Sequence, residues 1–291
     1  MAAENLPTAS EYIVHHLTNW TAHPPKGIID FSIFNIDSLF WSSLLGIVLC
    51  FFLWRAAKKM TSGVPGRFQA AVEILVEWVD NEAKGVIHNA ESRKLASPLA
   101  LVLFLWILLM NGMDLLPVDL LPQIWAHIVG AAGGDVHHAY MRVVPTADLP
   151  GMFALSISVL LLCFFYSIKI KGLGGWAHEL VTKPFGTSRN PLLALLMGVI
   201  NFAMQMIEFA AKTVSHAMRL FGNMYAGELV FALIALMGGA MGASLGGVLL
   251  PIGQIIAGTA WAIFHLLIIT IQAFIFMILA LVYIGQAHDS H

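Results

Sequence analysis

The chain has 291 residues, of which 58% are hydrophobic and only 11% are charged, and its mean hydropathy is +0.80. Soluble domains carry about a quarter charged residues, so this composition excludes a soluble globular protein and predicts an integral membrane protein. The formal net charge of -2 and the lack of a basic arm exclude a nucleic-acid binder, whose affinity depends on neutralising phosphates.

Five apolar stretches are long enough to cross a membrane as helices, for which 17 or more residues suffice. In chain order they are residues 38–54, 95–113, 149–168, 190–207 and 229–287. Between the first two, residues 66–90 place apolar and charged side chains on opposite faces of a helix. This pattern predicts an amphipathic helix at the membrane interface.

The lysines and arginines predict the sidedness of the loops. Seven follow the first stretch and four follow the third, so these loops are expected in the cytoplasm. Residues 1–37, 114–148 and 238–250 hold only Lys26 and Arg142, and are expected outside. Five crossings then leave the N-terminus outside and the C-terminus in the cytoplasm.

This reading divides the chain into four parts. They are an external N-terminal segment (1–37), the first span with the cytoplasmic interfacial helix (38–94), the second and third spans (95–190) and a helix hairpin (191–291). The second and third spans carry an external loop at 114–148 and a cytoplasmic loop at 169–190. We expect an all-α protein whose last two helices form a long, steeply tilted antiparallel hairpin.

The length of these two helices is unusual. Pro191 is expected to start a helix of up to 47 residues, and Pro251 to Gln286 gives another of up to 36. At 1.5 Å per residue they would measure roughly 70 and 54 Å, against a hydrocarbon core of about 30 Å. They must therefore tilt steeply, break or lie along the membrane.

Polar side chains within the first of these helices are candidate functional residues, because a charge at bilayer depth is costly and marks an ion pathway. Six of them form one polar stripe, because at 100° per residue the other five fall within about 40° of Arg219. They are Gln205, Glu208, Lys212, Ser215, Arg219 and Asn223. Glu228 falls on the opposite side of an ideal helix, so we expect it to serve a different aqueous space.

The last helix carries two polar positions on one face, His265 and Gln272. In an antiparallel hairpin, residues at equal depth have a constant sum of residue numbers. Arg219 with Gln272 gives 491, and Glu228 with His265 gives 493. We therefore expect each of these pairs to lie level, with the turn in the glycine-rich segment 242–247.

Two segments of the hairpin closely resemble subunit a of bacterial F-type ATP synthases. They are residues 218–228, MRLFGNMYAGE, and 261–274, WAIFHLLIITIQAF. The resemblance extends through 111–122 (NGMDLLPVDLLP), 142–148 (RVVPTAD) and 166–172 (YSIKIKG), and so covers the chain from about residue 95 onward.

The resemblance implies the stator subunit of a rotary, proton-translocating ATP synthase in the inner membrane of a bacterium. In this family two offset half-channels face a ring of c subunits, and an essential arginine, here Arg219, lies between them. The resemblance assigns Glu228 to the outer half-channel with His265 and Gln272, and it places Asn223 and Ser215 near the proton path. The implied partners are the c-ring, the b subunits of the peripheral stalk, the rest of the synthase and the lipid bilayer.

Several candidate residues keep a second interpretation. Several relatives carry a glutamate fourteen residues before the arginine, where this chain has Gln205, and Glu208 is the expected substitute in the inner half-channel. Glu208 and Lys212 can instead simply form an ion pair at i,i+4, and Ser215 and His216 can bond their own backbone. Asp114, Asp119 and Asp148, near the external ends of helices, either feed the outer path or face water.

Two other functional classes also use apolar chains with several membrane spans. A membrane cytochrome of the b type needs pairs of haem-ligating histidines, and only His216 and His265 lie at depth. An autonomous ion-coupled secondary transporter is expected to show internal repeats, and no similarity between the halves is visible. The sequence has no phosphate-cradling loop, nucleophile elbow or metal-ligand spacing, so we expect no ATP-hydrolysing site, cofactor or metal site in this chain.

Overall fold

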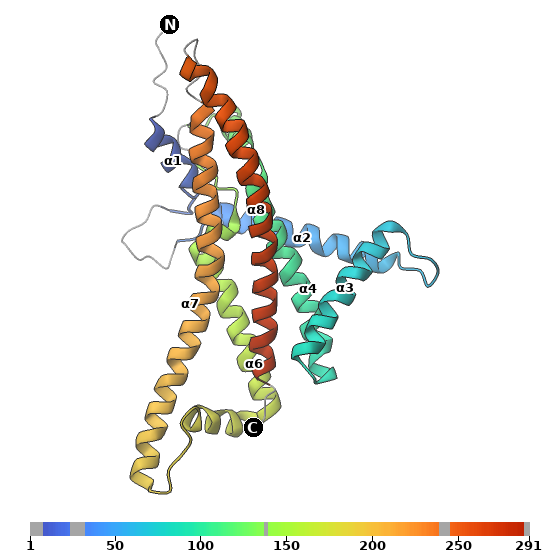
Figure 1. The fold of residues 1–291 in the computed structure, drawn as a ribbon, viewed down its shortest axis with the longest axis vertical. Coiled ribbons are helices and arrows are strands. Elements are labelled where there is room, and N and C mark those ends of the chain that lie inside the picture. The colour runs from blue at the N-terminus through green and yellow to red at the C-terminus, as the bar shows by residue number, and fades with distance from the viewer. Residues whose placement is uncertain (1–7, 24–32, 137–138, 239–244, 288–291) are drawn as a thin grey trace. The chain divides into compact units, whose positions relative to one another are not determined.

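The computed structural model describes residues 8–23, 33–136, 139–238 and 245–287 (Figure 1). Within these residues the regular structure is helical, apart from an isolated antiparallel bridge between Thr21 and Asn35. The α-helices are α1 (Ala9–Leu17), α2 (Ile36–Lys58), α3 (Arg67–Val86), α4 (Ala90–Gly112), α5 (Leu120–Ala131), α6 (Leu149–Thr182), α7 (Pro191–Gly238) and α8 (Leu245–Gln286). Two short 3-10 helices, η1 (Met113–Leu115) and η3 (Pro145–Ala147), follow α4 and precede α6.

Among the described residues five helices are long and apolar enough to cross a membrane, which confirms the expected number. They cover Ile36–Lys58, Ala90–Leu115, Leu149–Thr182, Pro191–Met237 and Leu249–Gln286. The expected external loop at 114–148 contains a further helix, α5, whose 12 residues are too few to span a bilayer.

The amphipathic helix predicted at 66–90 is present as α3. Its Val79 and Ala83 are buried in the chain, whereas Phe68 and Ile74 are exposed. On its polar side Asp80 accepts a hydrogen bond from Ser97 of α4 at 2.9 Å. The helix is confirmed, and its position at the membrane interface stays a prediction.

A break in the backbone divides α6 near the end of the third span. Gly172 has φ 70 and ψ 164, which no other residue type adopts readily. The apolar part, residues 149–171, is thereby separated from a shorter helix that ends at Thr182. The expected cytoplasmic loop therefore begins with a helix rather than with irregular chain.

The chain forms two compact units. Unit 1 contains Met1–Phe52, Leu105–Gly151 and Leu220–Ala273, and unit 2 contains Leu53–Phe104, Met152–Arg219 and Phe274–His291. The core of unit 1 includes Ile107, Leu220 and Met224, and that of unit 2 includes Tyr166 and Met277. Five of the described helices (α2, α4, α6, α7 and α8) contribute residues to both units.

Within each unit α7 and α8 run antiparallel, as predicted. In unit 1 the Gln254 amide donates to the Ala235 carbonyl at 3.4 Å, and the ring of Phe231 lies 6.4 Å from that of Trp261. In unit 2 Lys212 donates to Gln286 at 2.8 Å. The residue numbers of these pairs sum to 489, 492 and 498. The register is therefore within about two residues per helix of the predicted one in unit 1, and about three residues per helix from it in unit 2.

The hairpin differs from the prediction at one end. Helix α8 begins at Leu245 rather than at Pro251, so this proline lies inside the helix. A proline removes a single backbone donor and bends a helix, and membrane helices tolerate it because neighbouring groups satisfy the freed carbonyl. Of the expected turn at 242–247, residues 242–244 lie outside the described residues, and 245–247 already belong to α8.

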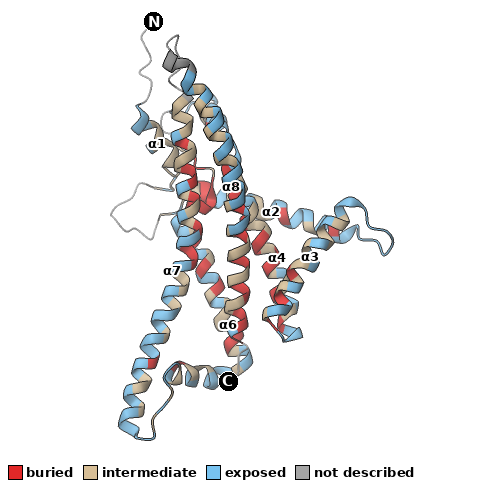
Figure 2. Ribbon diagram, in the orientation of Figure 1, coloured by how far each residue is buried: buried red, intermediate tan, exposed pale blue. Residues whose placement is uncertain are grey.

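The two hairpin helices are buried to very different extents. Only 6% of the most apolar window of α7 is buried in the chain, against 39% in α8. Figure 2 shows the exposed residues running along α7. With 48 residues, α7 is about 72 Å long at 1.5 Å per residue, so most of its surface is left for lipid or for a partner.

Candidate functional site

A buried pair of ionisable groups lies in unit 1, between the end of α4 and α8. Nε2 of His265 is 2.7 Å from Oδ2 of Asp114, and the exposed fractions of these residues are 0% and 6%. The contact has the length of an ion pair but is out of line for a hydrogen bond, so neither ring nitrogen of His265 has an aligned partner among the described residues. Such a buried imidazole is an unusual feature that demands a reason.

A glycine on α7 makes this pair possible. A Cβ added at Gly227 would lie 2.9 Å from Nδ1 of His265 and 3.1 Å from Oδ2 of Asp114. Because glycine lacks this atom, α7 approaches the pair closely enough to cover it. The three helices α4, α7 and α8 therefore meet at one buried point.

The next residue of α7 forms a second buried pair. Glu228 contacts Arg142, with Nη2 to Oε2 at 2.6 Å and Nε to Oε2 at 3.1 Å. Both side chains are buried, and the guanidinium also lies 5.4 Å from the ring of Tyr225. Glu228 thus sits next to the residue that packs on His265, as the hairpin register predicts, but its direct partner is Arg142.

Arg142 was not predicted as a site residue, because in sequence it is only one of the few cations of the expected external segments. Its burial, which an arginine almost never shows unless it is paired, depends on the fold, and no pattern around it in the sequence indicates that burial. In the structure its backbone N–H also donates to Asp37 at 3.0 Å, which anchors this segment.

The two other predicted aspartates have separate partners in unit 1. Asp119, at the start of α5, accepts a hydrogen bond from the Tyr12 hydroxyl at 2.9 Å and lies 3.0 Å from Nε2 of His16. The hydrogen bond with His16 lowers the pKa of Asp119. Asp148 accepts a hydrogen bond from the Asn35 amide at 2.8 Å. Burial raises the pKa of Asp148, so this carboxyl is not an ordinary solvent-facing group.

Unit 2 contains a cavity of about 440 Å³ that three of the predicted residues line: Gln205, Glu208 and Lys212. Lys212 lies 2.6 Å from Oε1 of Glu208 and donates to Gln286 of α8 at 2.8 Å. The stripe on α7 and the last turn of α8 therefore share one polar space.

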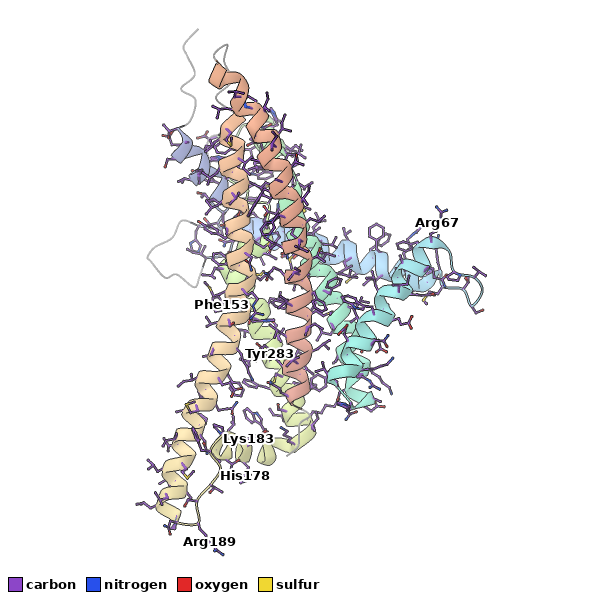
Figure 3. The ribbon with its side chains drawn as sticks, in the orientation of Figure 1. Arg67, Phe153, His178, Lys183, Arg189 and Tyr283 are labelled. Atoms are coloured by element: carbon purple, nitrogen blue, oxygen red, sulfur yellow. The ribbon has the colours of Figure 1, made fainter. Side chains whose placement is uncertain are left out.

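A second group of charges completes this cavity and was not predicted as a site. Glu179, in the part of α6 beyond the break, pairs with Lys171 at 2.7 Å and with Lys183 at 2.6 Å. Figure 3 labels Lys183 together with Tyr283 of α8, and both side chains line the cavity. The signal in the sequence was the i,i+4 spacing of Glu179 and Lys183.

The remaining predicted residues lie elsewhere. Ser215 and Arg219 are exposed on the surface of α7, and Asn223 and Gln272 are half-buried. His216 is buried with its ring 3.7 Å from the ring of Phe276, and it does not line the cavity. Arg219 belongs to unit 2 and Gln272 to unit 1, so their predicted pairing stays a prediction.

Comparison with known proteins covers nearly the whole chain. A family model described as ATP synthase A chain matches residues 39–285. Curated relatives named ATP synthase subunit a are 69% identical in Paracidovorax citrulli, 67% in Acidovorax sp. and 46% in Psychrobacter cryohalolentis. Each alignment covers 100% of this chain and at least 99% of the relative.

Proposed function

The chain belongs to the ATP synthase A chain family, and we propose that it conducts protons through two half-channels, one built in each unit. It is a non-catalytic, proton-translocating stator subunit of an F-type ATP synthase. The full-length matches do not favour an autonomous secondary transporter. The observation that carries the proposal is that separate sets of ionisable groups lie before and after Arg219 along α7.

The outer half-channel is built from the buried groups of unit 1. The pair of Asp114 and His265 is suited to proton transfer, because imidazole has two nitrogens, one of which can accept a proton while the other donates one. The guanidinium of Arg142 cannot release its proton, so it holds Glu228 in position without relaying a proton itself. Water that reaches this cluster supplies the aligned partner that His265 lacks.

The inner half-channel is built from the cavity of unit 2. Its volume of about 440 Å³ accommodates several water molecules, each of which occupies roughly 30 Å³ in the liquid. Glu208 lines this cavity one turn beyond Gln205, which supports Glu208 as the substitute for the glutamate that several relatives carry. Lys212 and Glu179 keep the cavity polar.

Arg219 acts as the gate between the two paths. A carboxyl on the partner ring must be protonated where it faces lipid, because an isolated anion in hydrocarbon is prohibitively costly. The permanent charge of Arg219 favours the ionised carboxylate as it passes and cannot itself carry a proton. A direct leak between the half-channels would dissipate about 2.3 kcal/mol per proton for each 100 mV of membrane potential.

The partners and location follow from this role. The exposed face of α7 that carries Arg219 is the surface offered to a ring of c subunits, and the b subunits of the peripheral stalk hold the chain against rotation. The protein spans the bacterial inner membrane with its N-terminus outside and its C-terminus in the cytoplasm.

The test is ATP-driven proton pumping by the whole synthase in inverted membrane vesicles. Arg219→Ala is expected to abolish pumping while ATP hydrolysis by the complex continues. Arg219→Lys is expected to be severely impaired as well, because an ammonium is a compact point charge that lacks the fork of donors of a guanidinium and deprotonates more readily once a partner covers it. Arg189→Ala, which removes an exposed arginine just before α7, is the matched control and should pump normally. Near-normal pumping by Arg219→Ala would refute the gate.

A further inference from the structure

The N-terminal helix α1 brings two ionisable side chains of unit 1 to Asp119. This helix starts with a capping box in which Thr8 and Glu11 bond each other's backbone. One turn apart on it, Tyr12 and His16 both contact Oδ1 of Asp119, at 2.9 and 3.0 Å. Nδ1 of His16 lies 2.9 Å from the backbone oxygen of Tyr12. When the imidazole is charged, both of its N–H groups therefore have an acceptor.

A small cavity joins His16 to the buried pairs. It has a volume of about 30 Å³, and its ionisable lining residues are His16, Asp114 and Glu228. The rest of the wall includes apolar side chains such as Met113 and Val144. A polar cavity needs roughly 10–15 Å³ to hold a water molecule that has several polar partners, so this one has room for a bridging water.

We propose that His16 and Asp119 form the outermost proton-exchanging pair of the outer half-channel, with α1 as part of its wall. This inference rests on the proposed role of Asp114 and Glu228 in that half-channel. A proton taken from external water sits on the imidazole of His16, passes to a water in the cavity and moves from that water to Asp114. Only N–H and O–H bonds form and break, and the reverse sequence releases a proton during pumping.

The charges around His16 suit this role. The titratable and charged groups that face it are Tyr12 and His15 on α1, Asp119 at the start of α5, Glu228 of α7 with its partner Arg142, and Asp114 across the cavity. Burial disfavours the charged imidazole. The hydrogen bonds to Asp119 and to the Tyr12 carbonyl, with the charges of Asp119 and Glu228, outweigh burial and raise the pKa of His16. The raised pKa favours the protonated form of the imidazole that donates to both acceptors.

The experiment measures ATP synthesis by the whole synthase in proteoliposomes whose interior corresponds to the external side. An acid–base jump drives synthesis, and the interior pH is varied at constant driving force. His16→Gln and Asp119→Asn are each expected to slow synthesis about tenfold at interior pH above 7, by the loss of one charge-assisted hydrogen bond from the path. The deficit should shrink at acidic interior pH, where protons are abundant enough to reach Asp114 directly. Because the two residues act as one pair, the double variant should be no slower than the slower single variant.

Two controls separate proton transfer from mere attachment of α1. His15→Gln changes the neighbouring histidine, which does not line the cavity, and should leave both the rate and the pH profile unchanged. Tyr12→Phe removes one contact of α1 with Asp119 and should leave the pH profile in place. The inference is overturned by an unaltered pH profile in His16→Gln, or by equal, pH-independent losses in His16→Gln and Tyr12→Phe.

Variants deeper in the path distinguish this inference from the proposed function. Asp114→Asn is expected to stop synthesis if the outer half-channel is assigned correctly. If Asp114→Asn loses ATP synthesis while His16→Gln makes ATP normally at every interior pH, only the role of His16 is overturned. Normal synthesis in Asp114→Asn would instead remove the proposed outer half-channel, and the role of His16 with it.

Discussion

Replacing Gly227 by alanine tests the buried cluster of unit 1 with a single methyl group. The added Cβ would lie 2.9 Å from Nδ1 of His265 and closer still to Cε1, whereas real Cβ contacts under 3.0 Å essentially do not occur. Ordinary separations between non-bonded heavy atoms are about 3.5–4.0 Å, so the imidazole must move by roughly 1 Å. That displacement breaks the 2.7 Å contact with Asp114.

The expected result is a loss of ATP-driven proton pumping in vesicles of about 10- to 100-fold, because a 1 Å misplacement of a reacting group can cost up to about a hundredfold. Helix propensity acts in the opposite direction, since alanine in place of glycine favours a helix by about 0.5–1 kcal/mol. A loss of pumping therefore cannot come from weakening α7.

Gly258→Ala is the matched control, because its added Cβ would meet Cγ2 of Ile234 at an ordinary 3.6 Å within the same hairpin. It should pump normally. Both variants are compared at equal amounts of assembled synthase, measured by immunoblot of the purified complex. Pumping by Gly227→Ala at the rate of Gly258→Ala would show that the position of His265 does not matter for proton flow, and would refute the assignment.

Three further predictions concern the other charged groups. Arg142→Met leaves Glu228 buried without its Arg142 partner and should destabilise the chain by about 3–5 kcal/mol. It should therefore lower the temperature at which the complex dissociates. The double variant Arg142→Met with Glu228→Met should recover part of the lost stability. The contact of α1 with Asp119 should be most stable at pH values between 3.8, the ordinary pKa of aspartate, and 6.5, the ordinary pKa of histidine. Because the pKa of Asp119 is lowered, the stabilisation of α1 by its carboxylate is lost as the pH falls below 3.8. Because the pKa of His16 is raised, the stabilisation by its imidazolium is lost as the pH rises through the raised value. Hydrogen exchange of residues 9–17, corrected for intrinsic rates, should show the greatest protection within this window, and pH-independent protection would contradict the prediction. Glu208→Gln should impair proton pumping. Adding Gln205→Glu in a double variant should restore it, because both side chains line one cavity and a carboxylate at either position can serve. A double variant that pumps as poorly as Glu208→Gln would show that the carboxylate cannot be moved from position 208 to 205.

Patterns along single helices were the part of the fold that could be predicted from sequence. The length of the uncharged apolar stretches predicted the five spans, and the constant sum of residue numbers predicted the hairpin register. Both predictions depend on the fixed rise and rotation per residue of a helix. The predicted start of α8 at Pro251 was wrong, because proline often begins a helix but is also tolerated inside a membrane helix.

The pairing of side chains from distant segments could not be predicted in the same way. Asp114 and His265 are 151 positions apart, and their contact depends on how the end of α4 meets the hairpin. Arg142 was interpreted by the rule for exposed loop charges, which does not apply once a loop folds inward and is buried. Glu179 reaches the cavity of unit 2 only because the chain changes direction at Gly172.

The sparse burial of α7 has a mechanical consequence if its exposed face meets a rotating ring. Exposed side chains such as Ile207, Val214 and Met218 offer only dispersion contacts, which are non-directional and contribute about 0.1–0.2 kcal/mol per atom pair. A sliding neighbour exchanges such contacts continuously and meets no deep energy well. A hydrogen bond, at about 1 kcal/mol net and with a preferred direction, would act as a brake at every step. The apolar surface of α7 then serves as a low-friction bearing that leaves Arg219 to make the strong, directional interaction.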